Sequence, residues 1–374
     1  MPSIPVADML RRARRKLNRR PQPLTRFIAE PWFVDSVETS QGALTVRGWA
    51  FLDGPAAADD VAGRFSVNGR PFDRVFYPLE RVDVGQCFPA RERAKDCGFV
   101  LVSNDAGVLY RGGVLEVTCR DRDTPAAAIA RDSWFIPDAS LHRDLPDEDR
   151  RFRVIGNRDA AGFLMSGCTD HERLDRACLV LTGKRLRDYR SILDWGCGCG
   201  RIARHLAPVA AGFHGCDIDG DNVAWCAEHL PGSYVASSLR PPLPYAQDTF
   251  DLIYGISIFT HFRPDLEALW LSELRRVAKP GALLLMTVHG QTTIDYARLD
   301  AAARGRLTAA VQRAGILFGG RNDQLDGYAA HEGQYVNVYH SQRYIRRIWA
   351  KYFEIVDILP GYLFTHDLAV MRRR

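Results

Sequence analysis

The sequence predicts an α/β fold built on a doubly wound, mostly parallel sheet, preceded by an antiparallel β-sandwich domain. Two observations lead to this prediction. From Ser191 onward, short apolar stretches alternate with amphipathic stretches of helical period, as in parallel sheets that are covered by helices on both faces. Between about Pro31 and Asp123, short strand patterns and turn residues follow one another without helical periodicity, which is typical of an antiparallel sandwich.

The composition is that of a folded protein with more than one domain. The chain has 374 residues, of which 46% are hydrophobic and 25% charged, so two or three domains are expected. No apolar run approaches the ~18 residues of a spanning helix, and we expect no secretory signal. The nine cysteines include no C-x-x-C pair, which favours a cytoplasmic protein with reduced thiols. Cys197-x-Cys199 lacks the second ligand pair of a zinc site, so no metal is predicted.

The net positive charge of the chain comes from its N-terminus. Of the 50 basic and 45 acidic residues, eight basic and one acidic fall within residues 1–26, so the remainder has 42 and 44. A near-neutral body lacks the electrostatic footprint of a nucleic-acid-binding protein. Residues 1–29 are predicted to be a basic tail or short helix. Its thin apolar stripe suits an anionic membrane surface or an acidic partner, and its composition also suits a solvated terminus.

Residues 30–123 are predicted to form the β-sandwich. The stretch Ala43–Asp53 partly alternates, Arg64–Tyr77 contains the hairpin signal Asn68-Gly69, and Cys97–Arg120 supplies two or three more strands. The pattern around Gly48-Trp49 resembles β-sandwich modules of bacterial glycosyltransferases and polysaccharide-modifying enzymes. This resemblance implies a role in polysaccharide biosynthesis. Trp49 could stack on a sugar ring or belong to the core.

Residues 124–168 are predicted to be a connector, and residues 169–374 a second folded domain. Proline and alanine punctuate the start of the connector, and glycines interrupt its end. A helix is then expected, with Thr169 or Asp170 as its N-cap and Gly183 just past its end. This helix leads directly into the alternating part of the chain.

The alternation after Ser191 predicts the order of the elements. The expected strands are Ile192–Leu193, Gly212–Cys216, Thr249–Phe259 and Ala282–Val288, and the expected helices begin at Arg201 and cover Asn222–His229 and Leu266–Ala278. Near the C-terminus, Tyr352–Ile358 and Asp367–Arg372 are close enough in sequence to pair as antiparallel strands.

A glycine-rich turn follows the first of these strands, with the sequence Asp194-Trp195-Gly196-Cys197-Gly198-Cys199-Gly200. Glycines at this point of a doubly wound sheet let a ligand approach the backbone closely. The dinucleotide fingerprint G-x-G-x-x-G is not met, because Arg201 occupies its third glycine position. A phosphate-binding P-loop is not met either, because no Gly-Lys-Ser/Thr follows. A nicotinamide-dependent dehydrogenase is therefore disfavoured.

The pattern acid-x-Gly-x-Gly-x-Gly resembles the first motif of the class I S-adenosylmethionine-dependent methyltransferases. The stretches Phe250-Asp251-Leu252-Ile253 and Lys279-Pro280-Gly281 resemble later strand and turn motifs of that family, and the resemblance covers about Tyr189–Val288. It implies a seven-stranded, Rossmann-like sheet, S-adenosylmethionine as cofactor and methyl transfer as the activity. The chemistry agrees, because this cofactor carries a sulfonium and an ammonium but no phosphate.

The resemblance also implies which residues bind the cofactor. Asp194 would help to hold the methionine moiety, Asp217 would accept both ribose hydroxyls, and Ile218 would pack on the adenine. The implied cofactor-binding residues are Asp194, Gly196, Cys197, Gly198, Gly200, Asp217, Ile218, Ser238, Leu239, Ile256 and Ser257. The region of Ser238 lacks the carboxylate that is common in the family. Asp219 and Asp221 are expected to cap the next helix.

The methyl acceptor is expected at the carboxyl ends of the central strands. His261 and His289 follow two of these strands, and either could remove a proton from a hydroxyl acceptor or merely hydrogen-bond a loop. Residues 290–338 are a long insertion, predicted to form a lid that shapes the acceptor pocket. Tyr335 and Tyr339 are candidate acceptor-binding residues.

The absence of several motifs disfavours some classes of methyl acceptor. No Asn-Pro-Pro-Tyr or Asp-Pro-Pro-Tyr follows the strand that contains Tyr254, which disfavours methylation of amino groups on DNA bases or glutamine. No carboxylate lies between Tyr254 and Ser257, which disfavours a catechol-type magnesium site.

We therefore predict an S-adenosylmethionine-dependent methyltransferase that acts on a hydroxyl of a sugar, glycan or related small molecule. The prediction that the acceptor is a sugar depends only on the resemblance of the β-sandwich to modules of polysaccharide-modifying enzymes. The alternative is a catalytically idle methyltransferase fold that binds a glycan or a partner protein. The intact set of Asp194, Asp217 and the loop glycines argues against that alternative.

Overall fold

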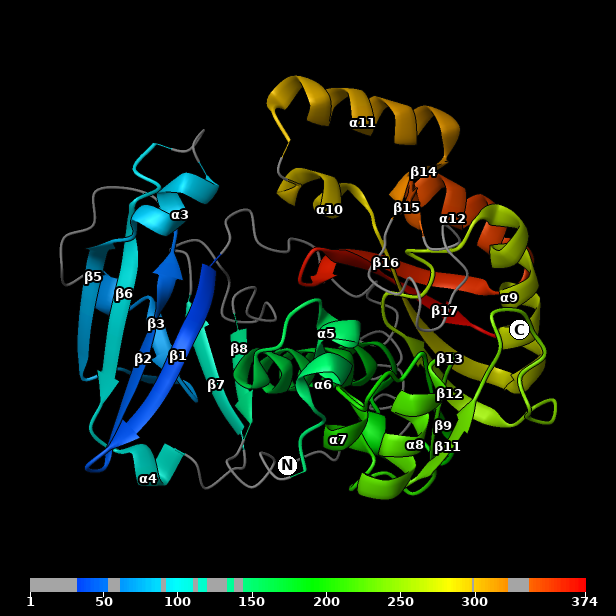
Figure 1. Cartoon of the computed structure of the whole chain (residues 1–374), viewed down its shortest axis with the longest axis horizontal. Coiled ribbons are helices and arrows are strands. Elements are labelled where there is room, and N and C mark those ends of the chain that lie inside the picture. Colours follow the sequence, from blue (N-terminus) through cyan, green and yellow to red (C-terminus); the bar gives the residue numbers. More distant parts are fainter. Residues whose placement is uncertain are drawn as a thin grey trace, which may run out of the picture.

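The computed structural model describes residues 32–52, 61–88, 92–109, 114–119, 133–137, 144–297, 299–321 and 336–374. Within these ranges an N-terminal pair of sheets and a C-terminal α/β unit lie on either side of helix α6 (Figure 1). The basic tail predicted for residues 1–29 lies outside the described residues. No helix in the described part of the chain is long and apolar enough to cross a bilayer.

The N-terminal part consists of two four-stranded sheets in which every pairing is antiparallel, as predicted. The first sheet contains, in spatial order, β1 (Trp32–Ser40), β2 (Ala43–Ala50), β6 (Asp96–Ser103) and β5 (Arg74–Glu80); the second contains β4 (Arg70–Pro71), β3 (Phe65–Val67), β7 (Val114–Cys119) and β8 (Ser133–Pro137). Two short helices, α3 (Val82–Cys87) and α4 (Ala106–Leu109), connect strands. The sandwich therefore extends past its predicted end at residue 123.

Local sequence signals explain the sandwich well. Asn68 and Gly69 have φ values of 47° and 74° and join β3 to β4, as a two-residue hairpin turn with both residues left-handed requires. The two sheets share one core to which α6 also contributes; its members include Val34, Leu44, Val46, Phe65, Val67, Leu115, Val117 and Met165. Trp49 packs against Phe51 and Phe88, with ring centroids 5.3 and 5.6 Å away.

The C-terminal part is built on a seven-stranded sheet in the order β11-β10-β9-β12-β13-β17-β16. The strands are β9 (Ile192–Trp195), β10 (Phe213–Asp217), β11 (Ser233–Ala236), β12 (Phe250–Gly255), β13 (Ala278–Val288), β16 (Glu354–Leu363) and β17 (His366–Arg372). The first five in the spatial order are parallel, and β17 and β16 run antiparallel to them. The sheet is thus mixed, and the antiparallel pair at its edge agrees with the sequence prediction. The strand predicted over Thr249–Phe259 is too long, because the chain leaves β12 after Gly255.

Both faces of this sheet are covered by helices. The helices of this part are α6 (Ala160–Thr182), η3 (Leu186–Asp188), α7 (Ala203–Leu206), α8 (Gly220–His229), α9 (Pro264–Val277), α12 (Gln342–Ile348) and η4 (Trp349–Lys351). Along β13, Leu284 and Met286 pack in one cluster with residues of α9 and α12, whereas Leu283 and Leu285 pack in another with residues of α6 and α7. Because successive side chains point to opposite faces and both faces are buried, the strand reads as one apolar run.

Helix α6 begins earlier than the sequence analysis predicts. Its N-cap is Asp159, whose carboxylate accepts hydrogen bonds from the first-turn N–H groups, so the prediction of Thr169 or Asp170 as the cap is wrong. The boundary predicted at residue 168 falls inside this helix. Position 167 inside this helix requires glycine, because the helix packs closely against the chain after the glycine-rich loop. A Cβ at Gly167 would lie 2.2 Å from the Arg201 carbonyl oxygen. The predicted stop is confirmed, since Gly183 has a φ of 76°.

The predicted connector contains a helix that the sequence analysis did not identify. Helix α5 (Glu148–Ile155) begins at the N-cap Asp147 and ends at Gly156, which has a φ of 72°. Figure 1 shows α5 beside α6.

The insertion predicted over residues 290–338 contains two helices and a strand pair. These are α10 (Gln291–Tyr296), α11 (Ala301–Ala314), β14 (Ile316–Arg321) and β15 (Val336–His340), and the two strands pair antiparallel. The N–H of Val338 donates to the Thr260 carbonyl at 2.7 Å, and the N–H of His340 donates to the His289 carbonyl at 2.8 Å. Strand β15 is therefore hydrogen-bonded to the chain just after both β12 and β13.

Candidate active site

The glycine-rich loop turns tightly after β9. Gly196, Gly198 and Gly200 have φ values of 80°, 50° and 79°, which glycine adopts without steric strain. A Cβ at Gly196 would lie 2.1 Å from Cδ1 of Ile258, and one at Gly198 would lie 2.7 Å from Cγ2 of Val154. The loop therefore needs glycine for its backbone conformation and for close packing against its neighbours.

The loop forms one wall of a cavity of about 160 Å³. Ten of the eleven residues predicted to bind the cofactor line it: Asp194, Gly196, Cys197, Gly198, Asp217, Ile218, Ser238, Leu239, Ile256 and Ser257. Gly200 does not line the cavity. Its Cβ position faces Leu230, 2.3 Å from Cδ1, so its part is to shape the turn.

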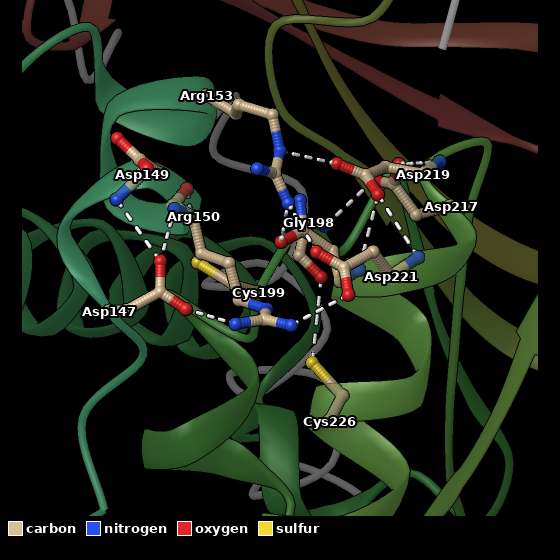
Figure 2. A network of polar contacts seen from close by, with 11 residues as sticks. Asp147, Asp149, Arg150, Arg153, Gly198, Cys199, Asp217, Asp219, Asp221 and Cys226 are labelled. Atoms are coloured by element: carbon tan, nitrogen blue, oxygen red, sulfur yellow. Dashed lines mark hydrogen bonds and ion pairs between the residues drawn. The ribbon is translucent and has the colours of Figure 1, made fainter. Parts of the chain in front are cut away.

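Asp217 lies at the end of β10, on the cavity wall. Its carboxylate accepts hydrogen bonds from the N–H of Gly198 at 2.7 Å and from the N–H of Asp219 at 2.9 Å (Figure 2). Each carboxylate oxygen has a further lone pair, so the side chain can still accept from two adjacent hydroxyls. Burial raises the pKa of Asp217, and these two N–H donors act in the opposite direction.

Asp194 is the most deeply buried acid of the loop, with 3% of its surface exposed. Burial raises the pKa of its carboxyl to about 7, while the Tyr254 phenol and the charge of Arg201 act in the opposite direction. A cation bound in the cavity would favour the ionised carboxylate. Arg201 itself is paired with Asp170 at 2.7 Å.

The acids after β10 divide into a cap and a partner for α5. Asp219 is the N-cap of α8, as predicted, and accepts from the N–H groups of Asp221 and Asn222 at 3.1 and 3.2 Å. Asp221 lies in the first turn of α8, so the prediction that it also caps this helix is wrong.

Helix α5 is held against these acids by two arginines (Figure 2). Nε of Arg153 is 2.7 Å from Asp219 Oδ2, and Nη2 of Arg153 is 2.8 Å from Asp221 Oδ2. Nη2 of Arg150 is 2.6 Å from Asp221 Oδ1. Arg153 and Val154 line the cavity, and sequence reasoning missed both. The sequence does contain a signal for this helix, because a capping residue, Asp147, precedes it and a terminating glycine, Gly156, follows it.

Of the two candidate bases, His261 lines the cavity and His289 does not. Nδ1 of His261 is 3.1 Å from the Val336 carbonyl oxygen. A carbonyl only accepts, so Nδ1 carries the proton and the lone pair of the neutral ring is on Nε2. The two histidine ring centroids are 6.3 Å apart.

A third histidine, His366 at the start of β17, joins this group although sequence reasoning did not select it. Its ring centroid is 4.9 Å from that of His289. Burial is the main cause that lowers the pKa of His261 and His289 to about 3 and that of His366 to about 4, and the repulsion that a protonated ring would meet from a second protonated histidine lowers each pKa further. All three are therefore neutral at pH 7. Within the described ranges no cluster of His, Cys, Asp or Glu is arranged to hold a metal ion.

Of the two candidate acceptor-binding tyrosines, the structure describes Tyr339 only. The ring of Tyr339 lies 5.5 Å from that of His289 but does not line the cavity. Tyr335 lies outside the described residues.

Comparison with known proteins finds a family whose model matches the part of the chain that contains most of this site. Residues 193–286 match the methyltransferase domain family. The chain is 26% identical over 129 residues to a ubiquinone biosynthesis O-methyltransferase of Rhizobium etli, covering 33% of this chain and 49% of that protein. It is 25% identical over 166 residues to a protein of the same name from Rhizobium johnstonii, covering 42% and 59%. The chain thus spans about half the length of these relatives.

Solved structures with a similar arrangement are also found. The PH0226 protein of Pyrococcus horikoshii is 17% identical, with a TM-score of 0.39, over 55% of this chain and 90% of that one. Magnesium protoporphyrin IX methyltransferase of Synechocystis is 18% identical, with a TM-score of 0.38, over 60% and 94%.

Residues 193–286 match the methyltransferase domain family, and the cofactor is S-adenosylmethionine. The cavity suits it. Asp217 offers a carboxylate for a ribose, and Asp194 lies where a cationic group would be stabilised. Among the described residues, the cavity lining contains no lysine, and its two arginines, Arg153 and Arg201, are paired with acids, so these residues form no free phosphate clamp.

Proposed function

We propose that the protein is an S-adenosylmethionine-dependent O-methyltransferase whose acceptor is a hydroxyl of a sugar, glycan or related small molecule. The observation that carries the proposal is that the cofactor loop, Asp217 and His261 line one and the same cavity. When bound, S-adenosylmethionine supplies a methyl carbon that is activated for displacement by its sulfonium. The names of the two Rhizobium relatives favour oxygen as the acceptor atom.

The residues of this chain would bind the cofactor, align the acceptor with it and remove the proton of the acceptor hydroxyl. Asp217 and Asp194 hold the cofactor end, and proximity supplies much of the rate enhancement. His261 presents the Nε2 lone pair of its neutral ring, because the Val336 carbonyl fixes the proton on Nδ1. This nitrogen takes the hydroxyl proton as the acceptor oxygen attacks. His289 is the alternative base, and the position of His261 on the cavity wall favours His261.

The direct test is methyl transfer from isotopically labelled S-adenosylmethionine to a panel of nucleotide sugars, free sugars and glycans, with phenolic compounds as a second panel. Mass spectrometry would identify the methylated atom. Transfer to a hydroxyl in the first panel supports the whole proposal. Transfer only to phenols would retain the enzyme class and remove the sugar, and transfer only to nitrogen would overturn the proposal.

Two variants separate the candidate bases. His261→Ala should lower turnover by at least tenfold and leave cofactor affinity unchanged, whereas His289→Ala should have the smaller effect. The reverse order would make His289 the base. Full activity in both variants would remove the histidine mechanism.

The alternative is a catalytically idle fold that binds a glycan or a partner protein through the β-sandwich. The packing of Trp49 against Phe51 and Phe88 weakens the idea that this ring is open for stacking on a sugar. Glycan binding by the protein with no affinity for S-adenosylmethionine would favour the alternative.

A further inference from the structure

A buried polar group outside the cavity holds strand β15 in place. Nε2 of His340, the last residue of β15, is 2.7 Å from Oε2 of Glu267, which lies in the first turns of α9. The hydroxyl of Tyr344 in α12 donates to the other oxygen of the same carboxylate at 2.9 Å. Glu267 is 1% exposed and His340 is 2% exposed, so this group lies entirely inside the protein.

The protonation of this group follows from its contacts. The carboxylate has two donors, and its position near the N-terminus of α9 favours negative charge. Nδ1 of His340 is buried and has no hydrogen-bond partner among the residues that the structure describes. A proton on that nitrogen would be left unsatisfied, which is costly. The arrangement is therefore an ionised Glu267 that accepts from a neutral His340 carrying its proton on Nε2.

Strand β15 in turn contacts both candidate bases. The Val336 carbonyl accepts from Nδ1 of His261 at 3.1 Å, and the N–H of His340 donates to the backbone carbonyl of His289 at 2.8 Å. One strand thus sets the ring orientation and the tautomer of His261 and is hydrogen-bonded to the backbone of His289.

From this chain of contacts we infer that Glu267 is a positioning residue for the acceptor side of the site. It acts through His340, which fixes the end of β15, and the Val336 carbonyl of β15 then fixes which nitrogen of His261 carries the lone pair. The inference rests on the proposed function, because it concerns the candidate base His261. It also explains why a long insertion returns to the sheet beside β12 and β13.

The effect of losing the carboxylate can be stated for each nitrogen. In Glu267→Gln, one oxygen remains where two donors now converge, and the new NH₂ group faces one of them. His340 keeps its acceptor only if the amide oxygen faces Nε2, and Tyr344 must then turn its hydroxyl to accept from the NH₂ group, so both donors lose the charged acceptor that they share in the wild type. The hold on β15 is weakened, and His261 is no longer restricted to the form with its proton on Nδ1.

The test reads the tautomers directly, by two-bond proton–nitrogen correlation on protein with ¹⁵N-labelled histidine. Signals are assigned with His261→Asn and His289→Asn. The matched control is Glu273→Gln, which alters a second buried carboxylate of α9 that binds the Leu243 N–H and Arg276 instead of β15. A conservative variant, His340→Gln, keeps an N–H donor for Glu267 and should preserve the wild-type pattern.

In the wild type, His261 should give the single pattern of a proton on Nδ1. In Glu267→Gln it should give a mixture of tautomers, while Glu273→Gln stays as wild type and cofactor affinity changes less than twofold. If Glu267→Gln does not fold, Tyr344→Phe, which removes one of the two donors, should give a partial form of the same change.

Unchanged histidine signals in a folded Glu267→Gln or, in its place, Tyr344→Phe would overturn the inference, and so would a wild-type His261 protonated on Nε2. The comparison needs no acceptor. A protein that methylates nothing would therefore contradict the proposed function while the tautomer result remained readable.

Discussion

At the scale of single residues, the cofactor end of the site depends on two buried carboxylates with different partners. Asp217 is held by two backbone N–H groups, whereas Asp194 has a pKa raised to about 7 by burial. The first is ready to accept hydroxyls, and the second gains most from a neighbouring cation. Their variants should therefore behave differently.

Asp217→Ala should weaken the binding of S-adenosylmethionine at least tenfold, which is about 1.4 kcal/mol, because the ribose would lose its acceptor. Isothermal titration calorimetry would measure the change. Asp265→Ala is the control, since that side chain is 70% exposed on α9. Equal affinity in both variants would remove Asp217 from the cofactor site.

The affinity for S-adenosylmethionine should fall as the pH is lowered through about 7. Below that pH the Asp194 carboxyl is protonated in the free protein, and a bound cation favours its ionised form. Binding near and below pH 7 should therefore release a proton, which calorimetry in buffers of different ionisation enthalpy would detect. Asp194→Asn should abolish this release. A release that persists in the variant would assign the proton to another group.

The sequence predicted these residues because they lie in one short motif after one strand. It could not predict His366 or the role of Val336, because their places depend on how strands far apart in the sequence meet. His366 reaches His289 only through the pairing of β17 with β13. Nothing in the local pattern around either residue indicates that pairing.

At the scale of elements, helix α5 packs against the cofactor loop and covers it. The sequence analysis missed it, because the helix is short and its surroundings rich in proline and glycine suggested a connector. Its apolar contact is Val154 on Gly198, and its polar contacts are the arginine pairs with Asp219 and Asp221.

Arg153→Gln should therefore speed cofactor dissociation and weaken binding by roughly three- to tenfold, mainly through the dissociation rate. Stopped-flow displacement would measure that rate. Arg158→Gln is the matched control, because Arg158 follows α5 in the chain and is 53% exposed. If Arg153→Gln leaves the dissociation rate unchanged, α5 does not act as a cover.

At the scale of the whole molecule, α6 joins the two parts. Its Met165 enters the core of the sandwich, while Leu174 and Cys178 pack under the large sheet. The guanidinium of Arg176 lies 2.5 Å from Glu116 of β7 and 4.8 Å from the ring centroid of Phe135 in β8. Local patterns predicted each part, but the sequence could not predict this joint because it depends on which residues of one helix face two different cores.

Arg176→Ala should lower the free energy of unfolding by about 1 kcal/mol, since it removes a half-buried ion pair and a cation–π contact. Chemical denaturation would measure the loss, and Arg187→Ala, an exposed arginine in η3, serves as the control. A separate early transition would indicate that the sandwich unfolds independently. No change in stability would show that this contact does not hold the parts together.

The measurement that tests the central claim most directly is calorimetric titration of the full chain with S-adenosylmethionine, with NAD as the matched control ligand. The structure and the matched domain predict micromolar binding of S-adenosylmethionine at one site per chain and no heat with NAD. Binding of NAD, or no binding of S-adenosylmethionine by the folded protein, would contradict the account of the glycine-rich loop and its cavity.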